Sequence, residues 1–358
     1  MLSVPVFTSL VALLACFAPN SVAAQQYGLS NTADTYHRLE SYPHALKMPF
    51  LDKYLSSRFY DYGGDTLIKS DSFIRLTGDR AGEAGWLFSK LPAMPESFQI
   101  EFDFKIHGHG TTLYGDGLAL WITSHKGELG PVFGSKDKFQ GLGLFFDTYK
   151  NNRPNKAFPY VMAMMGDGNT EYDRANDGLA NELAGCSARG LHNPRDISHA
   201  RLTYVKGKFM SLDLDYKTPD AEPRQWTNCF VLEGEKAQLP STGLFLGFSA
   251  RTGQLTENHD IHRVQVYSLR NPPQTYSDLR DHDAGMYTVA NAGNSGSSNG
   301  KRLYSQKSQS KGSWLGFFGK ALGVVAVIIV LVFAYGLYLT KVKDKREKAN
   351  RDAYYMSY

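Results

Sequence analysis

Apolar and polar side chains alternate strictly along residues 98–106. The apolar members are Phe98, Ile100, Phe102, Phe104 and Ile106, and the residues between them are Gln99, Glu101, Asp103 and Lys105. Successive side chains of a β-strand point to opposite faces, whereas a helix repeats about every 3.6 residues. The pattern therefore predicts a strand with one buried face, and a helix cannot place this apolar set on one side.

Short apolar runs predict further strands over most of the chain. Residues 118–122, 142–146 and 244–248 are continuous apolar runs, which are typical of strands buried on both faces. Residues 202–205 and 209–214 supply further strands. Many short strands and no long helix between Leu29 and Leu269 predict an all-β fold, a two-sheet β-sandwich. The length of 358 residues leaves room for one large domain of this kind with appendages.

The two ends of the chain carry apolar segments of different kinds. Residues 1–24 are uncharged, and their apolar run ends in the small residues of a cleavage site, as in a secretory signal peptide. Residues 321–340 are uncharged and long enough to cross the hydrocarbon core as one helix of about 20 residues. A cleaved signal followed by a single C-terminal transmembrane helix predicts a type I membrane protein.

These two segments divide the rest of the chain. Residues 25–270 are expected to form the luminal domain, and 341–358 a short cytosolic tail. Residues 271–320 begin with Pro272 and Pro273 and continue into a stretch rich in Gly, Ser and Asn, which predicts a flexible stalk.

The three cysteines and the net charge restrict the chain further. Cys16 leaves with the signal peptide, so Cys186 and Cys229 remain as an even pair in an oxidising compartment. We expect them to form one disulfide rather than two buried thiols. The formal net charge is only +4, which argues against nucleic acid as a partner.

Polar residues gather in three stretches. Residues 147–151 place oxygen-bearing side chains after an apolar strand, and 172–178 form a second loop rich in Asp and Asn. Calcium prefers such oxygen ligands, although loops of this composition also arise for purely local reasons. In 115–117, glycines flank Asp116 and permit either an outward-facing carboxylate or an ordinary tight turn.

Five segments carry a resemblance to a known family. They are residues 59–64 (FYDYGG), 115–121 (GDGLALW), 130–135 (GPVFGS), 158–160 (FPY) and 182–186 (ELAGC). Together they resemble the L-type, legume-like lectins of the early secretory pathway, especially the short-stalk vesicular integral membrane lectins. The resemblance covers nearly the whole chain and implies a legume-lectin-like jelly roll.

The resemblance also implies a site. Calcium would be held by Asp147, the carbonyl of Tyr149, Asn151 and Asp177. The residues expected at the sugar are Asp116, Asn151, Arg174, Gly253, Gln254 and Leu255.

Two of these positions depart from the family pattern. Arg174 stands where the family usually carries a sugar-contacting His, and a permanently cationic side chain cannot accept a hydrogen bond. Gln254 occupies a position where related lectins carry an acid. Arg174 is left either to donate to a sugar hydroxyl or to point into solvent.

The expected function is that of a calcium-dependent lectin, not an enzyme. It would bind high-mannose N-glycans on secretory glycoproteins and carry them between endoplasmic reticulum and Golgi. Its location would be the membrane of the endoplasmic reticulum, the intermediate compartment or the Golgi, with vesicle coat proteins contacting the tail.

Three alternatives remain beside this interpretation. Glu101 and Asp103 resemble the start of a strand-borne glycoside hydrolase motif, but Ile106 stands where the second Glu should fall. A sugar-blind cargo receptor or tether would use the sandwich for protein contacts. His107 with His109, and His259 with His262, lack the further ligands of a zinc site and are expected to be exposed or capping residues.

Overall fold

The computed structural model describes residues 36–92, 96–220, 224–240 and 243–292, together with 341, 343 and 345. The expected signal peptide (1–24) and transmembrane helix (321–340) lie outside these residues, as does nearly all of the expected tail. Among the helices that are described, none is both long and apolar enough to cross a bilayer.

Strands dominate the first of two compact units, which ends at Tyr287. One eight-stranded sheet has the order β13-β12-β11-β6-β15-β4-β3, with β1 paired to β15. Its strands are β1 (His37–Glu40), β3 (Leu67–Lys69), β4 (Phe73–Thr77), β6 (Phe98–His107), β11 (Ser198–Val205), β12 (Phe209–Asp215), β13 (Thr227–Glu233) and β15 (Asn258–Arg270). We call it the back sheet.

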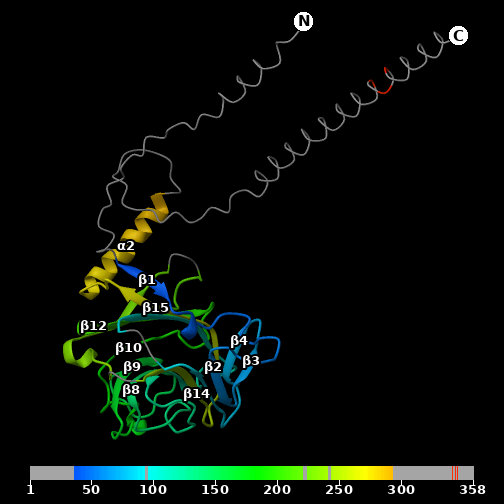
Figure 1. Ribbon diagram of the computed structural model, residues 1–358. Helices are drawn as coiled ribbons and strands as arrows, with labels where there is room; N and C mark the ends of the chain where they lie inside the picture. Colours follow the sequence, from blue (N-terminus) through cyan, green and yellow to red (C-terminus); the bar gives the residue numbers. More distant parts are fainter. Residues whose placement is uncertain are drawn as a thin grey trace, which may run out of the picture. The chain divides into compact units, whose positions relative to one another are not determined.

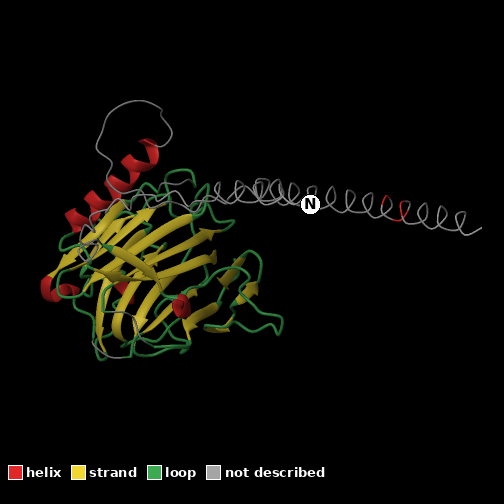
Figure 2. Ribbon diagram, turned by 45° about the horizontal axis from the view of Figure 1, so that its top comes forward, coloured by secondary structure: helices red, strands yellow, loops and turns green. Residues whose placement is uncertain are grey.

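A seven-stranded sheet, the front sheet, has the order β10-β9-β8-β7-β14-β5-β2. Its strands are β2 (Tyr60–Gly64), β5 (Ala84–Ser89), β7 (Gly117–Thr123), β8 (Gln140–Asp147), β9 (Tyr160–Asp167), β10 (Ala184–Ser187) and β14 (Phe245–Arg251). Figures 1 and 2 show the strands stacked in two layers. The predicted all-β, two-sheet sandwich is confirmed.

The main core lies between the two sheets. Phe102 of β6 contacts Phe146 of β8 and Phe248 of β14, with ring centroids 5.8 and 5.2 Å apart. The apolar residues of the alternating segment are all buried in this core. The single apolar face predicted for residues 98–106 is therefore confirmed.

The continuous apolar run in β7 has a different cause. Leu118, Leu120 and Ile122 face the main core, whereas Ala119 and Trp121 belong to a second apolar cluster. Phe133 and Phe139 of the loop after β7 join that cluster and cover the outer face of the sheet. Strands covered on both faces need no polar alternation, as the sequence pattern indicated.

The disulfide between Cys186 and Cys229 is present and joins β10 to β13. These are edge strands of the two sheets. The predicted pairing is confirmed, and it ties the two layers together at one side.

The expected flexible stalk begins instead with helix α2 (Tyr276–Ala292). Thr275 and Asp278 cap it reciprocally: each side chain accepts a hydrogen bond from the other's backbone N–H, at 3.2 and 2.9 Å. Leu279 is buried beside Phe209, and Asp283 pairs with Arg201 at 2.7 Å. The stalk prediction was wrong for 276–292 because tertiary contacts and a cap stabilise this segment. Residues 293–320 lie outside the description.

Three short 3-10 helices complete the described elements. They are η3 (Tyr42–His44), η4 (Arg174–Asn176) and η5 (Gly234–Ala237). Of these, η4 contributes to the site.

Candidate functional site

Three adjacent strands of the front sheet, β8, β7 and β14, bring polar residues together where the strands end. In the antiparallel register, Gly117 at the start of β7 lies opposite Asp147 at the end of β8 and Arg251 at the end of β14. Asp116 directly precedes Gly117, and its N–H donates to the carbonyl of Arg251 at 3.1 Å. Strand order thus places Asp116, Asp147 and Arg251 together, although they are far apart in the sequence.

Gly117 permits the close approach of these strands. Its φ of 133° lies in a region that side-chain-bearing residues rarely adopt, and an added Cβ would meet the carbonyl oxygen of Phe146 at 2.2 Å. The glycine beside Asp116, noted in the sequence as a possible tight turn, therefore starts a strand against β8.

The loop after β8 is joined to the η4 loop through Asp177. The backbone N–H of Asn151 donates to both carboxylate oxygens of Asp177 at 3.1 and 3.0 Å, and its side-chain amide donates to Oδ1 at 2.5 Å. Asp177 has a φ of 50°, which is tolerated by Asp, and Asp173 caps η4 by accepting from the N–H of Asn176. The two Asp- and Asn-rich stretches meet, as a shared cation site requires.

Arg153 connects the loop after β8 to the η4 loop and was not predicted from the sequence as a site residue. Its side chain is fully buried, donates to the carbonyl of Asp177 at 2.8 Å and pairs with Glu182. Its own N–H donates to Asp177 Oδ2 at 3.2 Å. A buried Arg that bonds to the opposite loop fixes the position of Asp177. Only the tertiary structure reveals this pairing, because Glu182 lies on another loop.

Asp147 carries the strongest electrostatic signal of the site. It is 5 % exposed, and its carboxylate accepts a hydrogen bond from the N–H of Tyr149 at 3.1 Å. Burial, and then the neighbouring Asp177 carboxylate, raise the pKa of Asp147 well above its usual range. Burial also raises the pKa of Asp116, partly offset by Arg251. Such acids favour either a proton or a bound cation.

The donor set fits a hard cation. Asp147, Asp177 and Asn151 provide carboxylate and amide oxygens, and Tyr149 adds a backbone carbonyl in the same loop. No group of three or more His, Cys, Asp or Glu side chains able to hold a metal occurs among the described residues. A cation here would depend on carbonyl and amide oxygens beside two carboxylates, which suits calcium and not zinc.

A pocket of about 210 Å³ opens over these residues. Its lining comprises Asp116, Pro131, Phe133, Asp147, Tyr149, Asn151, Tyr172, Arg174, Asp177 and Arg251. The structure therefore brings together six residues proposed from the sequence for calcium or sugar. Gly253, Gln254 and Leu255 do not line the pocket, although a Cβ on Gly253 would lie 3.3 Å from Asp116 Oδ1.

Four lining residues were not predicted as site residues. Pro131 and Phe133 lie in the loop that covers the front sheet, and Tyr172 is buried beneath the η4 loop. Burial, followed by the charges of Asp147 and Asp177, raises the pKa of Tyr172 well above its usual range. Arg251 was missed because only the register of β14 against β7 places it where these strands end.

The carboxylates of the hydrolase alternative are used in ion pairs. Glu101 pairs with Arg38 at 2.7 Å, and Asp103 pairs with Arg263 and His199, each at 2.7 Å. Both lie on the back sheet, away from the pocket lining. This arrangement offers no acid and nucleophile facing a shared cleft.

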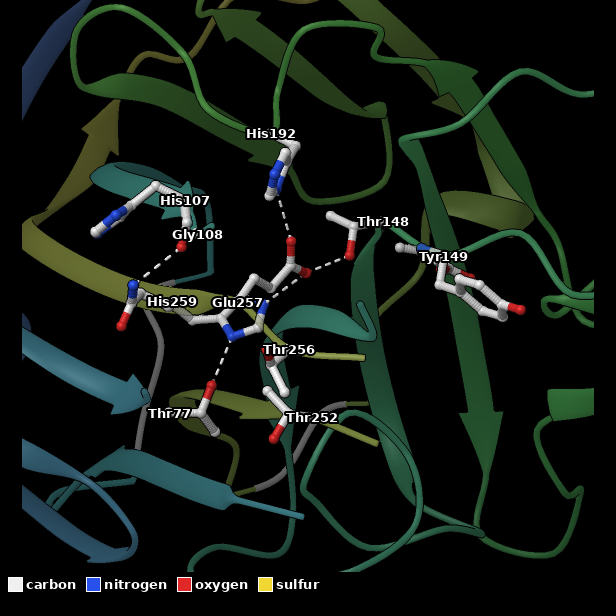
Figure 3. Close-up of polar contacts among 12 residues, drawn as sticks. Thr77, His107, Gly108, Thr148, Tyr149, His192, Thr252, Thr256, Glu257 and His259 are labelled. Carbon is white, nitrogen blue, oxygen red and sulfur yellow. Dashed lines mark hydrogen bonds and ion pairs between the residues drawn. The ribbon is translucent and has the colours of Figure 1, made fainter. Parts of the chain in front are cut away.

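The prediction of exposed or capping histidines is confirmed for His109, whose side chain is 99 % exposed, but needs correction for His107 and His259. His259 is fully buried on β15, where its ring contacts Thr77 at 2.7 Å and Glu257 at 3.1 Å, as Figure 3 shows. His107 faces Asp260 at 2.9 Å. Neither is a capping residue, because β15 pairs with β4 and β6 and buries this polar row.

Comparison with known proteins gives a consistent result. The model of the legume-like lectin family matches residues 37–275. An L-type lectin-like domain-containing protein of Schizosaccharomyces pombe is 39% identical over 221 residues, 62% of this chain and 68% of that protein. The mouse vesicular integral-membrane protein VIP36 is 35% identical over 249 residues, 68% and 67% of the two chains.

Solved structures agree in fold. The exoplasmic/lumenal domain of VIP36 in its Ca²⁺/Man-bound form has a TM-score of 0.59 and 34% identity, covering 64% of this chain and 91% of that one. The carbohydrate recognition domain of Emp47p, at 20% identity and a TM-score of 0.52, shares the fold; it covers 64% and 97% of the two chains.

Proposed function

The chain belongs to the legume-like lectin family, and from this premise we propose that it is a calcium-dependent lectin for high-mannose N-glycans. The observation that carries the proposal is Asp147, a buried carboxylate facing Asp177 with no cationic partner among the described residues. VIP36 has been crystallised with Ca²⁺ and with Ca²⁺ and Man3GlcNAc, which supports the same ligands here.

Asp147, the Tyr149 carbonyl, Asn151 and Asp177 would hold calcium. The ion, when bound, supplies the positive charge that two close carboxylates lack and favours their ionised form.

The chain's own side chains would then contact the sugar. Asp116 accepts hydrogen bonds from mannose hydroxyls. Asn151 uses one amide N–H for Asp177 at 2.5 Å, which leaves the second for a hydroxyl. Arg174 lines the pocket and can only donate. Because Asp177 and the buried Arg153 hold the loop in place, little conformational entropy is lost on binding.

The proposal describes a binding protein and not an enzyme. The acids of the hydrolase alternative are paired with Arg38, Arg263 and His199. Within the pocket, the polar groups suit hydroxyl and cation recognition.

Calorimetric titration of the full-length protein in detergent with Man3GlcNAc, in calcium and in chelator, tests the function. We expect binding only with calcium. A matched variant, Asp260→Asn, alters a buried acid on β15 outside the pocket lining and should bind as the wild type does. Binding of equal strength in chelator would overturn the calcium requirement, and no binding in either buffer would overturn the lectin proposal.

The proposed cellular role is that of a cargo receptor between endoplasmic reticulum and Golgi. It depends on the sequence segments proposed as signal peptide (1–24), membrane span (321–340) and cytosolic tail (341–358). The relative VIP36 is named a vesicular integral-membrane protein, which supports a membrane span in this chain. The terminal segment 354–358, YYMSY, would contact vesicle coats.

Deleting residues 354–358 should slow exit from the endoplasmic reticulum, as followed by pulse-chase, without preventing membrane insertion. A control that replaces Lys348 and Arg351 with Gln keeps the aromatic end and should leave at the normal rate. Unchanged kinetics after the deletion would show that the terminal residues carry no sorting signal.

A further inference from the structure

Two arginines line the same pocket as the three acids. Arg174 belongs to η4, and Arg251 ends β14; both side chains are exposed. Arg251 donates one long hydrogen bond, 3.4 Å, to the carbonyl of Gly130, and its charge acts on Asp116. Arg174 makes no side-chain hydrogen bond within the described part of the chain. Most of their N–H donors are therefore free for a ligand.

The pocket lining carries more positive charge than the recognition of a neutral sugar requires. Asp116, Asp147 and Asp177 together with one calcium ion leave a single negative charge, and the two guanidinium groups turn it into a single positive one. Guanidinium groups pair with phosphate and carboxylate through two parallel hydrogen bonds, which a hydroxyl cannot match.

We propose that this pocket prefers mannose-type sugars that carry an anionic group, phosphate or carboxylate, and that Arg251 contacts this group. The inference rests on the proposed lectin function and names its substrate class. Arg251 serves the anion, whereas Asp116 and Asn151 serve the sugar hydroxyls.

Titration of the full-length protein in detergent at saturating calcium tests it, with methyl α-mannoside, mannose 6-phosphate and mannuronic acid as probes. We expect at least one anionic probe to bind the wild type about tenfold more tightly than methyl α-mannoside. The tighter of the two identifies the anionic group.

Arg251→Gln should remove this advantage, so that the anionic probe binds this variant no more tightly than methyl α-mannoside does. Lys150→Gln removes an equal charge from an exposed residue of the calcium loop that does not line the pocket, and should keep the advantage. Equal affinity for all probes, or an advantage that survives Arg251→Gln, overturns the inference. Absence of binding to every probe overturns the lectin function itself.

A separate observation concerns Glu257, which is not among the site residues predicted from the sequence. Its side chain is fully buried at the end of the loop before β15. Figure 3 shows its carboxylate between three partners: Thr148, whose hydroxyl donates to it, His192 Nδ1 at 2.8 Å and His259 Nε2 at 3.1 Å. Burial opposes ionisation, but hydrogen bonds from His192 and His259 lower the pKa of Glu257 to about 2.

Two of these partners connect to the two loops that carry the pocket-lining acids Asp147 and Asp116. Thr148 lies between Asp147 and Tyr149 in the calcium loop. His192 bonds to the carbonyl of Gly110 at 2.9 Å and stacks on Tyr114, with ring centroids 3.5 Å apart and planes 3° apart. Tyr114 leads directly into Gly115 and Asp116. One buried carboxylate thus connects the calcium loop to the loop that carries Asp116.

The geometry points to Glu257 as a positioning residue for calcium and sugar binding, acting through Thr148 and through the His192–Tyr114 pair. Its removal would loosen the calcium loop and the loop of Asp116 at once, although Glu257 contacts neither ligand. It also adds negative charge near Asp147 and Asp116.

Glu257→Gln tests this in the full-length protein, with calcium affinity and thermal stability in chelator as separate readouts. Asp260→Asn is the matched control, because Asp260 is likewise a buried acid; it lies on β15 and pairs with Arg75 and His107. Both variants should lose stability in chelator. Only Glu257→Gln should lose calcium affinity, by about tenfold.

Thr148→Val serves as a second variant in case Glu257→Gln does not fold. It removes one hydrogen bond to Glu257 and leaves both histidine contacts, so we expect a smaller loss of calcium affinity. Calcium affinity that falls equally in Glu257→Gln and Asp260→Asn, or that is unchanged in Thr148→Val, overturns the positioning role. A wild type without calcium affinity would instead overturn the proposed calcium site.

Discussion

Buried acids occur in two regions of this molecule and have opposite surroundings. On the back sheet, Asp260 accepts two hydrogen bonds from Arg75, each 2.7 Å, and Asp103 pairs with Arg263 and His199. These partners lower the pKa of both acids against the effect of burial. At the pocket, burial and then the charge of Asp177 raise the pKa of Asp147.

The difference separates structural acids from acids available to a ligand. Each back-sheet acid receives its cation from a neighbouring strand, so its charge is neutralised within the fold. Asp147 and Asp177 face each other without such a cation, and a charge left unpaired in a buried place is costly unless an external ion compensates it. Four predictions test this contrast, in order of decreasing effect.

Removing a back-sheet cation should have the largest effect on stability. Arg201 is 1 % exposed and pairs with Asp213 and Asp283 at 2.9 and 2.7 Å. Arg201→Met leaves both acids without this guanidinium and should lower the free energy of unfolding by about 3–5 kcal/mol, with or without calcium. Urea denaturation measures this. Arg38→Met, which breaks a more exposed pair with Glu101, should cost about 1 kcal/mol or less.

Asp147→Ala should abolish stabilisation by calcium. In the wild type, calcium at a hundred times its dissociation constant should raise the free energy of unfolding by about 2.7 kcal/mol, because it binds only the folded state. Asp177→Ala should behave in the same way. Melting curves with and without calcium provide the test, and an equal calcium-induced rise in wild type and variants would show that the ion binds elsewhere.

The two classes of acid should respond oppositely to pH in chelator. The folded pKa of Asp260 lies below its unfolded value, so its stabilisation is present above about pH 4 and is lost as the pH falls further. The folded pKa of Asp147 lies above its unfolded value, so its contribution to stability is lost as the pH rises through the folded pKa.

Asp147→Asn should therefore gain stability over the wild type as the pH rises from about 4 to 7, whereas Asp260→Asn should be less stable throughout. Chemical denaturation across this range distinguishes the two. Parallel pH profiles for both variants would contradict the contrast.

The smallest effect is expected from Arg174→His. Arginine stays charged across the physiological range, whereas histidine titrates near pH 6.5. The variant should show glycan affinity that changes a few-fold between about pH 7 and 6, while the wild type stays nearly constant. Affinity at saturating calcium from about pH 7.5 to 5.5 measures this, and a steep change near pH 6.5 in the wild type would refute it.

Much of the fold was predictable because its signals are local. The alternation along residues 98–106 and the apolar runs at 118–122 and 142–146 reflect which faces of a strand are buried, and each reads directly from neighbouring residues. The start of α2 also has a local signal, the reciprocal cap of Thr275 and Asp278, which was overlooked beside Pro272 and Pro273.

Residue patterns alone predict the two-sheet sandwich, the pairing of Cys186 with Cys229 and the acids of the candidate calcium loops. They do not predict that Arg251 lines the pocket or that Glu257 contacts Thr148, 109 residues earlier in the chain; both follow from the folded arrangement. The physical reason is range: burial periodicity acts between neighbouring residues, whereas strand order and register bring together side chains whose sequence separation carries no pattern.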